Sequence, residues 1–169
     1  MKLITAPNEI LSKPVQLFDF KKMDAKGISD DMIALMQSKG GIGLSANQVG
    51  IDAQILVMKL HLLYSKETIT IINPQIEALS ADTETMPEGC LSHDGLILDI
   101  KRPVSVVVKY LDTDEKPCTI TLYDIDARCF LHEYDHLCGI EFTDRVSALK
   151  LTRARDRIKK QMKRMKTHG

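Results

Sequence analysis

Two histidines one helical turn apart constrain this chain of 169 residues more than any other feature. Residues 132–136 have the H-E-x-x-H pattern, in which two imidazoles on the same side of a helix can reach one metal ion. The flanking sequence agrees, because Ile125, Cys129 and both histidines recur at helical intervals and Gly139 is typical of the position after a helix. We therefore expect a helix over about 125–138, with a divalent metal ion on its inward face.

A catalytic metal site on such a helix needs a third protein ligand. Candidates after the second histidine face the wrong side of the helix, follow its end or lie in the terminal tail; they are Cys138, Glu141, Asp144, Asp156 and His168. Cys129 shares the helical face but lies about 10 Å along the axis from His136, so we expect it in the wall of a pocket. The third ligand is predicted upstream, at Cys90 in a turn-rich loop. Cys90, His132 and His136 would leave one position for water, whose pKa a metal can lower toward about 7.

Acidic residues beside the histidines are candidates for proton transfer. Glu133 and Asp135 flank the pair at similar angles on a helical wheel, but the glutamate of H-E-x-x-H patterns acts as a general base, which favours Glu133. Two interpretations of Asp135 stay open, a hydrogen bond that orients an imidazole and a surface salt bridge. His93, close to Cys90 in sequence, could compete as a ligand, although an exposed loop histidine is the favoured interpretation.

Strand-like segments fill the middle of the chain. Strands are predicted where β-branched, aromatic and alternating apolar residues are bounded by turn residues, at 54–60, 68–72, 76–81, 103–110 and 117–124. A loop is predicted at 86–95, a capped helix from Ser29 to Gly40, and a basic C-terminal helix over about 147–166. This order predicts an α+β fold, with short antiparallel or mixed strands around the central H-E-x-x-H helix, in a single domain over residues 1–169.

Charge is distributed unevenly along a chain whose net charge is zero. Residues 148–169 carry nine Lys or Arg against Asp156 alone, a net charge of +8, so the preceding residues carry −8. The last helix therefore combines an apolar stripe with a basic face. That basic face could either be exposed to solvent or bind phosphate groups. No apolar run reaches the roughly 18 residues of a membrane span, and no signal peptide or transit helix is evident, so a cytoplasmic protein without membrane contact is expected.

Three motifs together resemble, in order and spacing, those of the peptide deformylase family. They are Gly41-Ile42-Gly43-Leu44-Ser45-Ala46-Asn47-Gln48-Val49-Gly50, Glu88-Gly89-Cys90-Leu91-Ser92, and the segment from His132 to Leu137. The opening segment 10–15 is also similar, so the resemblance spans nearly the whole chain. The chain departs from the usual motifs at Ser45, Asn47, Leu131 and the pair His93-Asp94.

The resemblance implies a hydrolase that removes the N-formyl group from the N-terminal formylmethionine of nascent polypeptides and releases formate. Cys90, His132 and His136 would bind one divalent metal ion, Fe²⁺ in the cell, with Zn²⁺, Ni²⁺ or Co²⁺ able to replace it. By the same resemblance, Gln48 and the backbone N–H of Leu91 would stabilise the oxyanion, and Glu133 would pass a proton to the leaving amine. Residues whose backbone would pair with the substrate like an added strand are Ile42, Gly43 and Gly89.

The resemblance also suggests partners and a location. The basic last helix has a family counterpart that docks on the ribosome, where rRNA phosphates would attract it. We otherwise expect a monomer, in the cytoplasm of a bacterium or of a phage-infected cell. Two rival functions stay open: an endopeptidase, which would need a ligand downstream of His136, and a zinc-stabilised binding module, which would need a fourth ligand.

Overall fold

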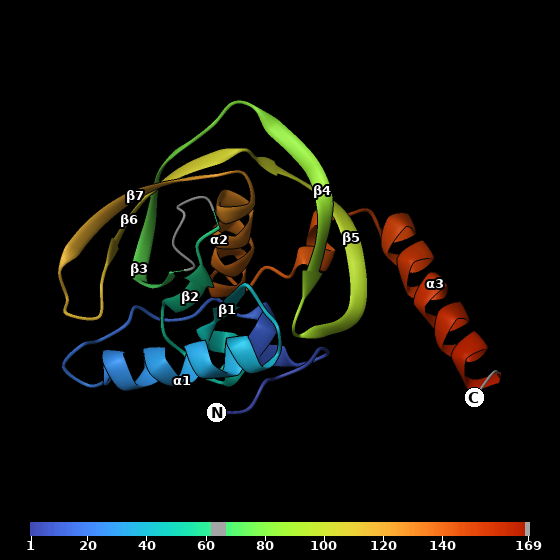
Figure 1. The fold of residues 1–169 in the computed structure, drawn as a ribbon, viewed down its shortest axis with the longest axis horizontal. Helices are drawn as coiled ribbons and strands as arrows, with labels where there is room; N and C mark the ends of the chain where they lie inside the picture. Colours follow the sequence, from blue (N-terminus) through green and yellow to red (C-terminus); the bar gives the residue numbers. More distant parts are fainter. Residues whose placement is uncertain (62–66, 168–169) are drawn as a thin grey trace.

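The computed structural model describes residues 1–61 and 67–167. It has an α+β fold, as predicted (Figure 1). Five strands form an antiparallel sheet in the order β1-β2-β3-β6-β7, and two more pair as an antiparallel hairpin, β4-β5. The sheet strands are β1 (Gly43–Ser45), β2 (Ile55–Lys59), β3 (Thr68–Leu79), β6 (Ser105–Leu111) and β7 (Pro117–Tyr123). The hairpin consists of β4 (Thr83–Cys90) and β5 (His93–Pro103).

Helix α2 (Asp124–Leu137) carries the H-E-x-x-H pattern and lies between the sheet and the hairpin (Figure 1). It contacts strands of both, and eleven of its residues are buried, which confirms the prediction of a central helix. Beyond its end, Gly139 has a φ of 72°. A Cβ atom there would lie 2.5 Å from the backbone carbon of Lys13. Glycine is therefore required where the N-terminal segment crosses the helix end.

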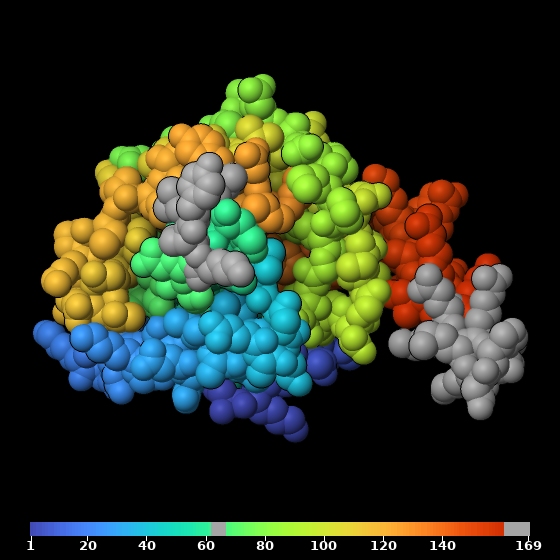
Figure 2. Space-filling model, in the orientation of Figure 1, coloured from blue at the N-terminus to red at the C-terminus, as the bar shows by residue number. Residues whose placement is uncertain are grey.

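Three groups of buried apolar side chains surround α2. One packs Phe130 and Leu131 of α2 against the sheet, and a second lies between β1, β2 and helix α1 (Ala25–Ser38). The third joins Phe142, from the short helix η3 (Phe142–Arg145), to β5 and to helix α3 (Ala148–Thr167). Figure 2 shows the described part of α3, in red, beside the hairpin. Because each buried side chain contributes about 1.5–3 kcal/mol, these groups fix the elements around α2.

Helix α1 begins earlier than predicted. Asp24 is its N-cap, and the carboxylate accepts a hydrogen bond from the Gly27 N–H at 3.1 Å. Ser29, the predicted cap, lies inside the helix and is buried, with its hydroxyl 2.6 Å from that of Thr70. A serine followed by acidic residues resembles a cap in sequence, but here its hydroxyl serves a tertiary contact.

The prediction of a loop at 86–95 is wrong, because most of these residues belong to the hairpin. Pro87 and Gly89 suggested a loop, yet β4 pairs on one side only, so the missing N–H of Pro87 need not break a ladder. The strands predicted at 68–72 and 76–81 are one strand, β3, interrupted by two register shifts. No helix within the described residues is both long and apolar enough to span a membrane.

Candidate metal centre

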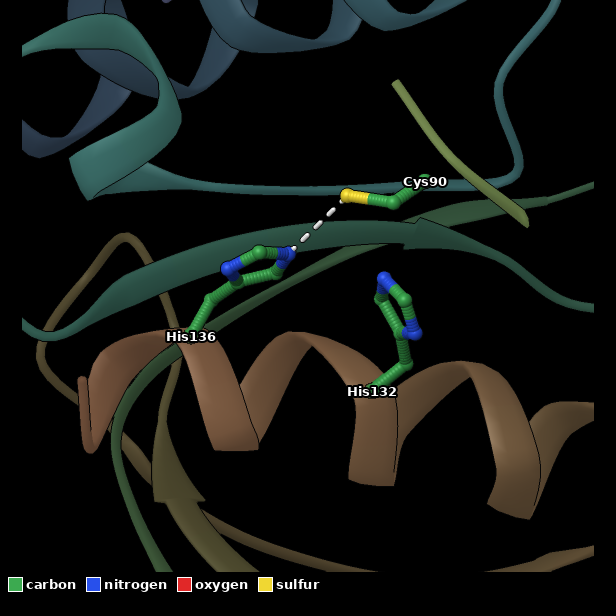
Figure 3. Close-up of side chains that lie close together, drawn as sticks. All are labelled: Cys90, His132 and His136. Atoms are coloured by element: carbon green, nitrogen blue, oxygen red, sulfur yellow. Dashed lines mark hydrogen bonds between the residues drawn. The ribbon is translucent and has the colours of Figure 1, made fainter. Parts of the chain in front are cut away.

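Cys90, His132 and His136 come together in the structure (Figure 3). Their ligand atoms all lie within 4.8 Å of one another, and Cys90 Sγ is 3.2 Å from His136 Nε2. The imidazoles project from successive turns of α2, and the thiol faces them from the end of β4. Within the described part of the chain this group contains no fourth His, Cys, Asp or Glu. Three protein donors are the set expected of an open, catalytic site.

A carboxylate orients the first imidazole. Oε2 of Glu88 accepts a hydrogen bond from Nδ1–H of His132 at 3.1 Å, which leaves Nε2 of His132 facing Cys90 (Figure 3). Such a carboxylate commonly fixes the tautomer of a ligating histidine. Nδ1 of His136, by contrast, is buried and has no hydrogen-bond partner among the residues that the structure describes.

This donor set fits a divalent transition-metal ion, because a thiolate and two imidazoles bind such ions at about 2.0–2.3 Å and can lie 3.2 Å apart around one of them. Burial disfavours charge on both histidines. Hydrogen bonds with Cys90 and Glu88 nevertheless raise the pKa of His132 to about 10, while burial and the neighbouring His132 hold the pKa of His136 well below its usual value. The imidazole of His136 is therefore neutral at ordinary pH, which is the form of histidine that binds a metal ion.

Glu133 lies beside the donors in a buried position. Burial raises its pKa to about 7, although nearby His132 and Ser45 act in the opposite direction. A Cβ atom on Gly43 would lie 2.6 Å from Oε1 of Glu133, so β1 passes directly over this carboxyl group. A carboxyl group with a pKa near neutrality can both accept and donate a proton at physiological pH.

Gln48 directs its side-chain amide at the donors. Nε2–H donates toward Cys90 Sγ at 3.5 Å and to Ser92 Oγ at 3.1 Å. Oε1 accepts from the N–H and the hydroxyl of Ser45, both at 2.9 Å, and these contacts fix which end of the amide faces the thiol. Leu91, the other predicted oxyanion donor, follows Cys90 at the turn of the hairpin, and its side chain packs against the core beside α1.

A cavity of about 420 Å³ opens beside these groups, between segments 40–43 and 87–91 with α2 below them. The residues predicted to contact the substrate all line it, namely Ile42, Gly43, Gly89 and Cys129. The Ile42 carbonyl already accepts hydrogen bonds from the Cys129 thiol at 3.4 Å and from the Lys59 N–H at 2.9 Å. Because backbone groups alternate along a strand, those of Gly43 face away from β2, toward the cavity.

A buried cluster of charges that was not predicted surrounds Glu88. This carboxylate accepts hydrogen bonds from Arg102 at 2.7 and 3.0 Å and from Arg128 at 2.7 Å. Arg102 also bonds Asp135 at 2.8 Å, and Asp135 pairs in turn with Arg145. Although burial alone would raise the pKa of Glu88, its hydrogen-bonded partners lower it to about 2. Glu88 therefore remains an anion beside the candidate metal ligands at any ordinary pH.

Asp135 differs from both interpretations of its sequence position. It is 5% exposed and bonds two arginines, so it is no surface salt bridge, and among the described residues no hydrogen bond joins it to an imidazole. Glu88 had one signal in the sequence, since it lies two residues before the ligand Cys90. Arg102 and Arg128 had none, because only the folded chain brings them to Glu88.

His93 also differs from expectation, because it is neither one of the grouped donors nor exposed. Its side chain is 9% exposed, and its Nε2 lies 2.6 Å from Oε2 of Glu141. The partner comes from a segment 48 residues later in the chain. Local sequence around His93 therefore could not reveal its burial.

Three other residues that differ from the family motifs, Ser45, Asn47 and Leu131, are in contact with α2 or belong to it. Asn47 Nδ2 donates to the backbone carbonyl of His136 at 2.6 Å, and the Ser45 hydroxyl donates to Asn47 Oδ1 at 3.0 Å. That carbonyl belongs to the last turn of α2 and also accepts from the Gly139 N–H at 3.0 Å. Leu131 is buried in the core, and its carbonyl accepts from Arg102. These residues support the helix that carries two of the candidate ligands.

Known proteins share this sequence and fold. The polypeptide deformylase family model matches residues 1–152. The chain is 36% identical to a peptide deformylase of Synechococcus sp. over 148 residues, which cover 87% of this chain and 74% of that one. It is 35% identical to a peptide deformylase of Agrobacterium fabrum, with 88% of each chain covered.

Solved structures agree with the sequence matches. The crystal structure of a peptide deformylase from Synechococcus elongatus in complex with actinonin has a TM-score of 0.85 and 36% identity, over 92% of this chain and 86% of that one. Peptide deformylase from Ehrlichia chaffeensis has a TM-score of 0.85 and 32% identity, over 96% and 97%. Sequence and fold together show that the chain belongs to the polypeptide deformylase family.

Proposed function

We propose that this protein removes the N-formyl group from the N-terminal formylmethionine of nascent polypeptides and releases formate, with one divalent metal ion bound by Cys90, His132 and His136. The observation that supports this most directly is that these donors meet the carboxyl group of Glu133 and the amide of Gln48 beside one cavity. Hydrolysis of a formamide needs an activated water, a donor for the oxyanion and a proton for the leaving amine. The chain has a candidate for each.

Fe²⁺ is the proposed ion in the cell, and Zn²⁺, Ni²⁺ or Co²⁺ would bind the same donors in purified protein. When bound, such an ion lowers the pKa of water and polarises a carbonyl group. A thiolate with two imidazoles suits these ions better than Mg²⁺ or Ca²⁺, which prefer oxygen ligands. Because thiolates oxidise readily, the protein should be prepared without oxygen.

The cavity is proposed to hold the start of the substrate chain. Edge strands β1 and β4 both border it, so a peptide lying between them could bond the backbone of Gly43 and Gly89 as an added strand. The methionine side chain would contact Ile125 and Cys129, the residues of α2 that line the cavity, and Ile42, which also lines it. Apolar walls with a few polar groups are typical of small-ligand sites.

Catalysis is proposed to depend on three groups of the chain. As the formyl carbon becomes tetrahedral, the Gln48 amide and the backbone N–H of Leu91 donate hydrogen bonds to its oxyanion. Glu133 accepts the proton of the attacking water and passes it to the leaving amine nitrogen, a double role that fits its pKa of about 7. The products are formate and a free amino terminus.

We extend the proposal to location and partners. The protein would act as a monomer in the cytoplasm, and α3 would hold it on the ribosome near emerging chains. Support comes from the net charge of +8 over residues 148–169 and from the exposure of basic side chains on α3. Co-sedimentation with ribosomes is the measurement that tests this contact.

Formate release from a formyl-methionyl tripeptide tests the function, with protein loaded with Fe²⁺ or Co²⁺ without oxygen and its metal content measured. The Glu133→Gln variant should lose at least about 100-fold in kcat, because general acid–base catalysis typically contributes that much. The Glu77→Gln variant is the matched control, since Glu77 is half-exposed on β3 and pairs only with Lys109 among the described residues.

Three results of the formate-release assay would contradict parts of this proposal. No formate from metal-loaded wild-type protein would refute the proposed function, and cleavage of an internal peptide bond would favour the endopeptidase. Equal turnover by wild type and Glu133→Gln would refute the proposed proton carrier alone.

A further inference from the structure

The residue that faces Cys90 across the hairpin turn is His93. Their Cα atoms are register partners around a turn of two residues, Leu91 and Ser92, where the hairpin register shifts. A contact that fixes His93 therefore also fixes the backbone from which the Cys90 thiol projects. The same turn carries the N–H of Leu91 that is proposed to bind the oxyanion.

His93 is held by a partly buried carboxylate from outside the hairpin. Its Nε2–H donates to Oε2 of Glu141 at 2.6 Å, and the two side chains are 9% and 16% exposed. The other oxygen of Glu141 accepts from the exposed Ser12 hydroxyl at 2.8 Å, so both carboxylate oxygens have a hydrogen-bond partner. A short hydrogen bond between fixed, largely buried partners holds its geometry far better than an exposed pair of mobile side chains.

Phe142, the neighbour of Glu141, reaches the other side of the metal centre. It is 1% exposed, and its ring centroid lies 5.2 Å from that of His93 and 5.6 Å from that of His132. Both contacts are edge-on, at interplanar angles of 64° and 60°, a favourable arrangement for aromatic rings. Residues 141–142 therefore contact the hairpin turn and a ligating imidazole at once.

The hairpin turn is also held by contacts of Ser92, which do not involve His93. The carbonyl of Ser92 accepts from the Ala6 N–H at 2.8 Å, and its hydroxyl accepts from Gln48 at 3.1 Å. Without the bond between His93 and Glu141 the hairpin would thus stay attached, while the strand end that bears Cys90 would be less constrained. Such a change should alter the metal centre more than the fold.

We propose that His93 and Glu141 are positioning residues of the metal centre. Their bond holds the start of β5 at the separation from α2 at which the Cys90 thiol meets the two imidazoles, while Phe142 supports His132. The proposal rests on the proposed metal-dependent function. It assigns a role to one of the positions at which this chain departs from the family motifs.

The test compares His93→Ala, Glu141→Ala and the double variant, each loaded with Co²⁺. Each single variant should lower kcat by about 10–100-fold, the usual cost of losing a partner that orients metal ligands, while KM changes by less than about 2-fold. The double variant should fall little further than the worse single variant, because the two residues act as one unit. The visible absorption of Co²⁺, which reports the thiolate and the ligand geometry, should change in all three.

Two further variants separate positioning from general stability. Glu141→Gln keeps an acceptor for His93 and should recover most of kcat and the Co²⁺ absorption. His61→Ala removes another bond between a histidine and a carboxylate, the 3.1 Å contact with Asp126, and should change neither readout. Hydrogen exchange of metal-free protein should be faster across residues 90–95 in His93→Ala than in wild type.

The proposal is overturned if His93→Ala and Glu141→Ala lower the free energy of unfolding but leave kcat and the Co²⁺ absorption within about 2-fold of wild type. It is also overturned if their effects on kcat simply multiply in the double variant. Failure of the proposed function would be recognised separately, because metal-loaded wild-type protein would then release no formate.

Discussion

The position of Glu133, the proposed proton carrier, comes at a cost in stability. It is 5% exposed, its Oε2 has no hydrogen-bond partner within the described structure, and burial raises its pKa to about 7. In the unfolded chain the same group ionises near the ordinary glutamate pKa of 4.5. Folding therefore resists the ionisation on which the proposed proton transfer depends.

This conflict predicts a pH-dependent gain of stability in Glu133→Gln. Between about pH 4.5 and 7 the folded chain retains a proton on Glu133 that the unfolded chain loses, so the contribution of Glu133 to the free energy of unfolding of metal-free protein falls as pH rises. The variant lacks this loss and should be more stable at pH 8 by up to about 3 kcal/mol, with little difference at pH 4. Urea unfolding with a chelator measures it, and an advantage independent of pH would contradict the assigned pKa.

At the scale of elements, the approach of β1 to α2 decides whether the carboxyl group of Glu133 has room. Gly43 is buried in β1, and a Cβ atom there would lie 2.6 Å from Glu133 Oε1 and 2.7 Å from Cys129 Sγ. Any larger residue must push strand and helix apart or displace Glu133. The glycine is thus required by packing, independently of any contact with substrate.

Gly43→Ala should therefore lower kcat by at least about 100-fold, since small misplacements of catalytic groups cost that much. Gly27→Ala is the matched control, because its Cβ atom would also meet a carboxylate, that of Asp24, but on α1 far from the cavity in sequence and structure. Steady-state formate release should be lost in the first variant and kept in the second. Wild-type turnover by Gly43→Ala would show that β1 can move away at little cost.

Helices and strands could be predicted from the sequence where the local residue pattern determines the secondary structure. The helix at α2 has a clear period, and its ligands lie four residues apart, so both the element and two donors were evident. The hairpin was missed because Pro87 and Gly89 punctuate β4 as they would a loop. Burial of His93 and the cluster around Glu88 depend on segments joined only by folding, so no local pattern could indicate them.

At the scale of the whole molecule, opposite charges lie in different parts of the chain. Residues 148–169 carry +8 and the remainder −8. Leu151, Ala154 and Ile158 pack α3 onto the third core group, and the basic side chains of residues 150–160 are exposed. Removing the whole helix would also uncover apolar residues, and a sharper test keeps the packing.

Replacing four exposed basic residues of α3 by Gln should weaken binding to ribosomes and leave formate release intact. They are Arg153, Arg157, Lys159 and Lys160. Because each neutralised phosphate contact releases about one counterion, the dependence of binding on salt concentration should become less steep. Co-sedimentation over a series of salt concentrations measures this slope, and a profile identical to wild type would exclude α3 as the contact. An equal number of Lys→Gln changes at Lys21, Lys22, Lys101 and Lys109 provides the control.

The position of β1 and β4 at the borders of their sheets has a consequence for what can enter the cavity. In the proposed binding mode, one extended chain would pair with the backbone of both borders, whereas a helix offers no free backbone groups for such pairing. Substrates would then be selected first by whether their N-terminus is extended and only afterwards by their side chains. An N-terminus that has already folded could not pair with β1 and β4. The reaction would therefore take place after a new chain emerges and before its N-terminus folds.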